Sequence, residues 1–233
     1  MGDYILLIDT ATPVCSVAIS HNNAVLDYLD SETANAHASE LTLNIQNLLL
    51  RNQLTTADLA AVAVSMGPGS YTGLRIGVST AKGLCYALDI PLMAVNTLDA
   101  MVDGFRFRQH YAEDTIFVPM IDARRMEVYC AYYDLNANSL SPTEAKIIDA
   151  TSFEYWQNGR NQLLLFGSGA DKFKDVFANN PHVSVITGFV NSARFLSVKA
   201  YEKFCQKDFE DLIYFEPFYL KEFVATVSKK SLL

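Results

Sequence analysis

Residues 62–95 read VAVSMGPGSYTGLRIGVSTAKGLCYALDIPLMAV, and this stretch decides the fold. It begins with an apolar run that is long enough for a buried strand, and a Gly-Pro-Gly sequence interrupts that run. Ser70 or Thr72 can then cap a helix that continues to about Leu88. A proline follows, and the last four residues begin a second strand. The stretch therefore predicts a strand, a glycine loop, a helix and another strand.

Small residues recur along one face of this predicted helix. Gly73, Gly77 and Ala81 are spaced by four residues, so their positions lie above one another. Glycine within a helix costs roughly 1 kcal/mol relative to alanine, which indicates that something packs very close to this face. Two interpretations stay open: the helix lies tightly on its own sheet, or the face contacts a helix of another chain.

The glycine loop is similar to a phosphate cradle but matches none of the standard motifs. A P-loop requires G-x-x-x-x-G-K-[ST], whereas five residues separate Gly67 from Gly73 and no lysine follows directly. The nucleophile elbow G-x-S-x-G also fails, because Pro68 and Thr72 stand where glycines are required. The loop therefore does not favour Ser70 as a nucleophile.

The composition indicates a globular chain that is long enough for one large domain or two small lobes. Half of the 233 residues are hydrophobic, and the net charge is −8, which makes the chain a poor binder of nucleic acid by itself. The four cysteines are scattered without a C-x-x-C pair, which favours reduced thiols in the core. Neither a membrane-spanning run nor a signal peptide is recognisable, so we expect a cytoplasmic protein without a membrane segment.

The residues before the central stretch predict a three-stranded meander and a helix. Apolar or alternating runs at about 4–8, 15–20 and 24–29 are separated by two turns, as in strands that pair in sequence. A helix is expected from about 37 to 52. His37 is an ordinary first-turn residue in this pattern, since a helical zinc pair needs a second histidine four residues later.

The helix that follows the meander carries two apolar stripes. Leu41, Ile45 and Leu48 lie on one face at helical spacing, and Leu43 and Leu50 mark a second stripe. A helix with two apolar stripes must bury both of them. One stripe can pack on the sheet, and the other would suit a partner.

The second half of the chain repeats the order of the first. A strand ends at Ile121-Asp122 as another ends at Ile8-Asp9, and the loop Gly167-Ser168-Gly169-Ala170 echoes residues 67–70. Repeated order at a similar offset indicates two lobes that each contain one meander-plus-helix unit. We place the lobes at residues 1–103 and 104–220, followed by a tail at 221–233.

Several motifs together resemble those of the TsaB (YeaZ) family, whose members are partners in making threonylcarbamoyladenosine in tRNA. They are IDTAT at 8–12, HASEL at 37–41, GPGSYTGLRIG at 67–77, AKGL at 81–84 and MIDAR at 120–124. The resemblance is specific over most of residues 4–135 and looser beyond, although EPFYL at 216–220 is similar to the ending of the family.

The resemblance implies an α/β fold of the actin/Hsp70-like (ASKHA) type. Its two lobes are each ribonuclease-H-like, with a mixed sheet and flanking helices. A helix near 193–206 would return to the first lobe. The related TsaD subunit holds a metal with an H-x-x-x-H pair, and alignment of the family motifs puts Thr97 and Met101 at these histidines. Neither residue can replace an imidazole ligand, so we expect neither a metal site nor catalytic residues.

The resemblance also implies an eroded nucleotide site. Ala11 stands where an ATPase of this fold carries glycine, and the turn Asp122-Ala123-Arg124 has no glycine that would let a phosphate approach. We expect no cofactor on this chain, with ATP and metal on partner subunits. Arg124 and Arg125 are expected to be solvated or to pair with Asp122 and Glu127. The residues of a possible vestigial nucleotide site are Asp9, Thr10, Gly67, Gly69, Gly167 and Gly169.

These expectations lead to the hypothesis of a non-catalytic scaffold. It would dock a TsaD-type catalytic subunit and a TsaE-type ATPase, form a homodimer when alone, and meet tRNA only through the complex. The alternatives are an ATPase or carbamoyl transferase in its own right and, as a lower alternative, a peptidase. The interface or dimer residues that we predict are Leu41, Ile45, Leu48, Gly73, Ile76, Gly77, Thr80 and Ala81.

Overall fold

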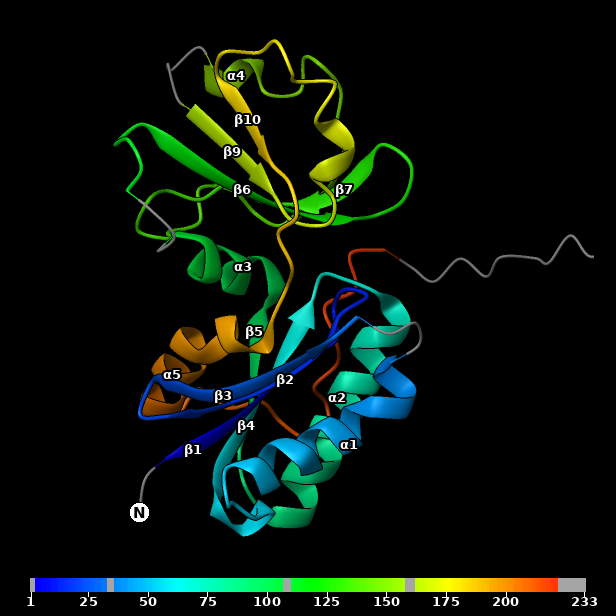
Figure 1. Ribbon diagram of the computed structural model, residues 1–233, viewed down its shortest axis with the longest axis vertical. Coiled ribbons are helices and arrows are strands. Elements are labelled where there is room, and N and C mark those ends of the chain that lie inside the picture. Colours follow the sequence, from blue (N-terminus) through cyan, green and yellow to red (C-terminus); the bar gives the residue numbers. More distant parts are fainter. Residues whose placement is uncertain (1–2, 33–35, 107–109, 158–161, 222–233) are drawn as a thin grey trace, which may run out of the picture.

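The computed structural model describes residues 3–32, 36–106, 110–157 and 162–221. The chain forms two lobes that lie one above the other, and each lobe is built around one five-stranded sheet (Figure 1). The sequence-derived lobe boundary near residue 103 stays a prediction. The predicted tail, apart from Lys221, lies outside the described residues.

The first sheet has the strand order β3-β2-β1-β4-β5. An antiparallel meander consists of β1 (Tyr4–Asp9), β2 (Cys15–His21) and β3 (Ala24–Ser31), while β4 (Leu59–Gly67) and β5 (Leu92–Asn96) run parallel to β1. The central strands β1 and β4 are buried at nearly every position. Helices on both faces of the sheet explain why these strands are apolar runs rather than alternating ones.

The second sheet repeats this arrangement, with the order β8-β7-β6-β9-β10 when it is read from the β8 edge. Its antiparallel part is β6 (Thr115–Asp122), β7 (Glu127–Cys130) and β8 (Glu144–Ile147), and β9 (Gln162–Phe166) and β10 (Val183–Ile186) continue parallel to β6. Both sheets therefore have the same strand order once β6 is matched to β1. The predicted actin/Hsp70-like fold of two ribonuclease-H-like lobes is confirmed.

Two helices cover one face of the first sheet (Figure 1). α1 (Ala36–Arg51) leads through a 3-10 turn at Thr56–Asp58 into β4, and α2 (Tyr71–Leu88) connects β4 to β5. Ser70 is the N-cap of α2, and its Oγ accepts a hydrogen bond from the Gly73 amide at 3.3 Å. The central stretch of sequence thus folds as strand, loop, helix and strand, as its pattern predicts.

The opposite face of the first sheet is covered by residues that follow the second lobe in the sequence. A 3-10 turn at Ala193–Leu196 runs directly into α5 (Ser197–Gln206), and both pack against Ile5 and Leu7 of β1. The chain therefore crosses back to the first lobe after β10. The one helix that the sequence indicates near 193–206 is divided into these two parts.

The helix α3 (Thr97–Arg106) carries the chain from β5 toward the second lobe. Its Met101 and Phe105 belong to an apolar cluster with Phe117 and Phe166 of the second sheet. The rings of Phe105 and Phe166 stack with their centroids 4.0 Å apart. Apolar packing between α3 and the second sheet therefore joins the two lobes here.

Among the residues that the structure describes, the remaining helical elements of the second lobe are short. They are α4 (Glu154–Gln157) and a 3-10 turn at Asp171–Phe173, which lie beside a core that includes Phe153 and Phe173. Within the described ranges, no helix combines the length and the hydropathy that a membrane span requires.

The last described residues, 211–221, form a strap that lies along α2 and reaches the second lobe. The ammonium group of Lys82 in α2 donates to the carbonyl of Phe215 at 3.0 Å, which holds the strap on the first lobe. At the end of the strap, Lys221 forms an ion pair with Glu127 of β7. The strap therefore contacts both lobes.

The cysteines provide a direct test of this packing. Cys15, Cys85 and Cys130 are buried, and burial raises their thiol pKa values to about 11, about 12 and about 12, whereas Cys205 is exposed. At pH 8 only about one thousandth or less of each buried thiol would be the reactive thiolate. We expect a maleimide to label Cys205 alone in the native protein and all four cysteines in denaturant, as read by mass spectrometry. Rapid native labelling of a second cysteine would contradict the described core.

Candidate functional site

A groove lies between α1 and α2 on the outer side of the first lobe. Its volume is about 330 Å³, and its walls are largely apolar side chains of the two helices, with the 3-10 turn before β4 at one end. Ile45, Leu49 and Leu50 of α1 face Thr80 and Leu84 of α2 across it. We call this feature the α1–α2 groove. An exposed apolar groove of this kind is typical of a site that another protein or an apolar ligand covers.

The two stripes of α1 explain why one helix both closes the core and forms the groove. Leu41 and Leu48 are fully buried against the first sheet, whereas Leu43 and Leu50 on the second stripe are 55% and 65% exposed. Their burial corrects the prediction of Leu41 and Leu48 as interface residues, because side chains in the core cannot contact a partner. Ile45 is also buried, but its side chain lines the groove.

The small residues of α2 face their own lobe. A Cβ atom at Gly73 would fall on the carbonyl oxygen of Thr10, and one at Gly77 would fall on the Thr10 hydroxyl. The hydroxyl of Thr10 donates to the carbonyl of Gly73 at 2.8 Å, and Ala81 is fully buried in the core. Of the two interpretations, the helix lying tightly on its own lobe is therefore correct. The prediction of Gly73, Gly77 and Ala81 as interface residues is corrected accordingly.

Two members of the predicted interface set keep access to solvent. Ile76 and Thr80 are partly exposed on α2, and Thr80 lines the groove. The predicted set did not include Leu43 and Leu50, which are more exposed, or Leu84, which also lines the groove. When a helix has leucines on two stripes, the sequence alone does not show which stripe packs into the core and which lies on the surface.

The turn after β1 is held together by internal hydrogen bonds. The Asp9 carboxylate is buried and accepts from the Ala11 amide at 2.9 Å and from the Ser65 hydroxyl at 2.8 Å. Burial nevertheless raises the pKa of Asp9, because removal from water disfavours the charged form more than these bonds favour it. The Ser70 amide donates to the carbonyl of Ala11 at 2.7 Å. These polar groups of the turn therefore form hydrogen bonds within the first lobe.

The glycines of the predicted nucleotide site make room for the chain itself. The missing side chain of Gly69 faces Ala11, and that of Gly67 faces the strap at the carbonyl of Phe218. In the second lobe, Gly167 approaches Met101, and Gly169 lies close to the backbone where β6 ends. Atoms of the chain itself therefore fill the space beside each of these four glycines. The vestigial nucleotide site of these four glycines with Asp9 and Thr10 remains a prediction.

The two positions that the resemblance matches to metal ligands are buried. Met101 packs into the apolar cluster between α3 and the second sheet, and Thr97 has no accessible surface. His37 is engaged elsewhere, since its Nε2 lies 2.8 Å from the carbonyl oxygen of Thr12 and ties α1 to the turn after β1. In the part of the chain that the structure describes, no three His, Cys, Asp or Glu side chains gather as a metal site would require.

Asn191 is a residue that the sequence analysis missed. It lies on the segment that returns from the second lobe, is buried, and acts to lower the pKa of Asp9 against the effect of burial. The hydroxyl of the adjacent Ser192 donates to Asp30 Oδ1 at 2.9 Å. Its neighbour Ala193 donates its amide to Ser16 Oγ at 2.7 Å. These bonds fix the returning segment on the first lobe. No local pattern could have found them, because they join residues 162 and 177 positions apart.

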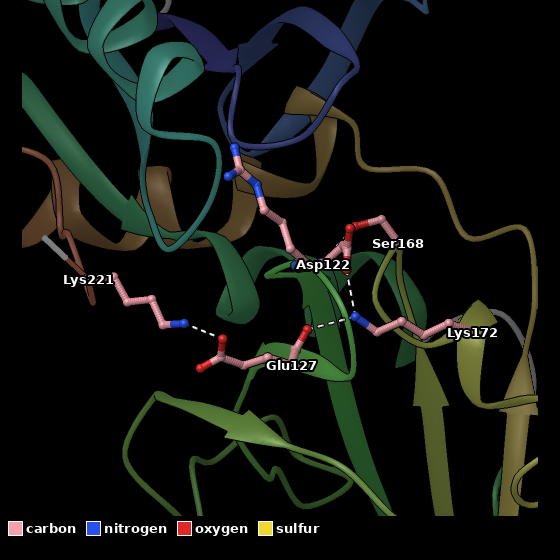
Figure 2. Close-up of polar contacts among 6 residues, drawn as sticks. Asp122, Glu127, Ser168, Lys172 and Lys221 are labelled. Atoms are coloured by element: carbon pink, nitrogen blue, oxygen red, sulfur yellow. Dashed lines mark hydrogen bonds and ion pairs between the residues drawn. The ribbon is translucent and has the colours of Figure 1, made fainter. Parts of the chain in front are cut away.

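The acidic side chains of the turn between β6 and β7 pair with lysines from other parts of the chain. Lys172 pairs with Asp122 at 2.6 Å and also donates to the carbonyl of Glu127 at 2.7 Å, while Lys221 pairs with the Glu127 carboxylate (Figure 2). Both acidic side chains therefore form ion pairs with lysines. Arg124 and Arg125 are exposed, so of the two expected states, solvated or paired with Asp122 and Glu127, the structure shows the solvated one.

Comparison with known proteins places this arrangement in a family. A family model described as TsaD, tRNA N6-adenosine threonylcarbamoyltransferase, matches residues 30–159, which is more than half of the chain. The tRNA threonylcarbamoyladenosine biosynthesis protein TsaB of Escherichia coli is 33% identical over 74% of this chain and 74% of its own length. The protein of the same name from Bacillus subtilis is 35% identical over 81% of this chain and 80% of its own length.

A solved structure shares the two-lobe fold. The structure titled YeaZ from Pseudomonas aeruginosa aligns with a TM-score of 0.74 at 24% identity and covers 94% of this chain and 100% of that one. The sequence motifs, the duplicated sheet order and the relatives agree with one another. The chain belongs to the TsaB family.

Proposed function

We propose that this chain is a non-catalytic subunit in the biosynthesis of threonylcarbamoyladenosine in tRNA, and that it docks a TsaD-type catalytic subunit. The α1–α2 groove carries the proposal. It is an apolar, outward-facing surface of the first lobe, and Leu50 on its wall is 65% exposed. A folded partner that covers the groove would remove this apolar surface from water.

The loops between the lobes support the non-catalytic part of the proposal. Met101 and Thr97 offer no imidazole at the positions of the related metal pair. The amide of Ala11 binds Asp9, and the glycines of both loops approach this chain's own atoms. ATP and metal would then be supplied by the TsaD-type subunit and a TsaE-type ATPase. In the absence of partners, the same groove would join two copies of this chain.

Light scattering on a sizing column tests the proposal. The chain alone is expected to elute as a homodimer, and addition of the TsaD-type enzyme from the same organism is expected to replace this species by a one-to-one complex. The complex should restore threonylcarbamoyl transfer to tRNA that neither protein alone supports. Separate elution of the two proteins, with and without ATP, would overturn the docking proposal. ATP turnover or transfer by this chain alone would overturn its non-catalytic part.

A further inference from the structure

The β6–β7 turn carries two guanidinium groups that the lobe does not neutralise. Arg124 and Arg125 are exposed, and no described residue reaches either guanidinium with a hydrogen bond or an ion pair. The nearby acids Asp122 and Glu127 are each paired with a lysine (Figure 2). Two unpaired positive charges therefore stand together on a chain whose net charge is −8.

The backbone of this turn is unusual for arginine. Arg124 has φ +73° and Arg125 has φ +50°, so two consecutive residues with full side chains lie in the left-handed region that glycine and asparagine adopt more easily. The turn is fixed by Asp122, whose Oδ1 accepts from the Arg124 amide at 3.2 Å. Two consecutive left-handed residues occur in tight hairpin turns, and the amide of Glu127 closes this turn by donating to the carbonyl of Arg124 at 3.1 Å.

The turn lies where α/β folds bind ligands. β6 ends at Asp122 and its parallel neighbour β9 ends at Phe166, so the turn and the following Gly167 loop share the carboxyl edge of the second sheet. The Asp122 amide donates to Ser168 Oγ at 3.3 Å and joins the two loops (Figure 2). Ligands of open α/β sheets bind outside the carboxyl ends of their strands.

We infer that Arg124 and Arg125 bind backbone phosphates of the tRNA on which the complex acts. This inference rests on the proposed function, and it names a contact that the chain itself makes with the substrate. Guanidinium groups match phosphate oxygens with paired hydrogen bonds and stay charged at any physiological pH. The contact adds to the basic surface of the partner, because the acidic remainder of this chain gives little affinity for RNA by itself.

The salt dependence of tRNA binding tests the inference. Fluorescently labelled tRNA is titrated with the complex of this chain and the TsaD-type enzyme at several salt concentrations. The double variant Arg124→Gln/Arg125→Gln is expected to bind about tenfold more weakly near physiological salt. It is also expected to flatten the slope of log K against log salt by about 1.5, since each lost phosphate contact removes about 0.7–0.9. The control Lys199→Gln removes one charge, which pairs with Glu202 in α5, and should leave both values unchanged.

A second variant separates loss of contact from loss of folding. Arg124→Gly/Arg125→Gly relieves the left-handed strain, so it should raise Tm while weakening tRNA binding as much as the glutamine variant does. An unchanged salt slope in both double variants would overturn the inference. Weakened binding of the TsaE-type ATPase with tRNA binding intact would assign the turn to a protein partner instead. If no complex forms, the proposed function fails. The chain alone is then titrated with tRNA at low salt, and the same difference in salt slope between the native chain and the double variants is required. Without that difference, the inference fails as well.

Discussion

Gly73→Ala is expected to lower the free energy of unfolding by about 2–3 kcal/mol, whereas Gly83→Ala in the same helix should raise it by about 1 kcal/mol. Both substitutions replace glycine by the residue with the highest helix propensity. At Gly83 the new methyl group meets nothing within 4 Å, so the gain in propensity remains. At Gly73 it would meet the carbonyl of Thr10, a backbone group that can yield only if α2 moves away from the turn.

Denaturant unfolding monitored by far-ultraviolet circular dichroism measures both changes. The movement of α2 would also weaken the 2.8 Å hydrogen bond from the Thr10 hydroxyl to the Gly73 carbonyl, which adds to the loss. Equal effects of the two substitutions would mean that the close approach of Thr10 is absent, and the small-residue face would again be available to a partner. A bulky residue at Gly77 would likewise report on folding rather than on docking, because Thr10 fills that position too.

The sequence predicts the arrangement of elements well because the relevant signals are local. The run from the Val62 strand to the Val95 strand contains a strand pattern, a glycine loop, an N-cap at Ser70 and a helix of the observed length. The same signals recur at Ile121-Asp122 and Gly167, so the duplication of the lobe is readable from the chain. The strand order of each sheet then follows from a repeated unit.

The site is less predictable because its contacts join distant residues. Periodicity places the leucines of α1 on two stripes but does not say which stripe meets the sheet. The charge pattern around Asp122 suggests pairing with adjacent arginines, yet the paired lysines come from positions 50 and 94 residues away from their partners in sequence. The spacing of Gly73 and Gly77 shows a close approach but does not identify Thr10 as the group that approaches.

Leu50→Asp is expected to weaken the complex with the TsaD-type subunit by about 30-fold or more, which corresponds to the roughly 2 kcal/mol of an interface hot spot. Leu50 is 65% exposed and lines the α1–α2 groove, so the substitution should leave the core of the lobe intact. In the complex it would place an unpaired carboxylate in apolar surroundings. Aspartate tests the interface more stringently than lysine would, because the longer side chain of lysine could extend past the interface and keep its charge in water.

Ile147→Asp is the matched control for this substitution. Ile147 is 71% exposed on β8 in the second lobe, so the change is similar in exposure and identical in charge but lies away from the groove. Affinity measured by calorimetry should change by less than about threefold in the control, as for surface substitutions away from an interface. Equal loss in both variants would indicate general charge repulsion. Full affinity in Leu50→Asp, with an unchanged Tm, would remove the groove from the interface and leave the exposed stripe of α1 without its assigned partner.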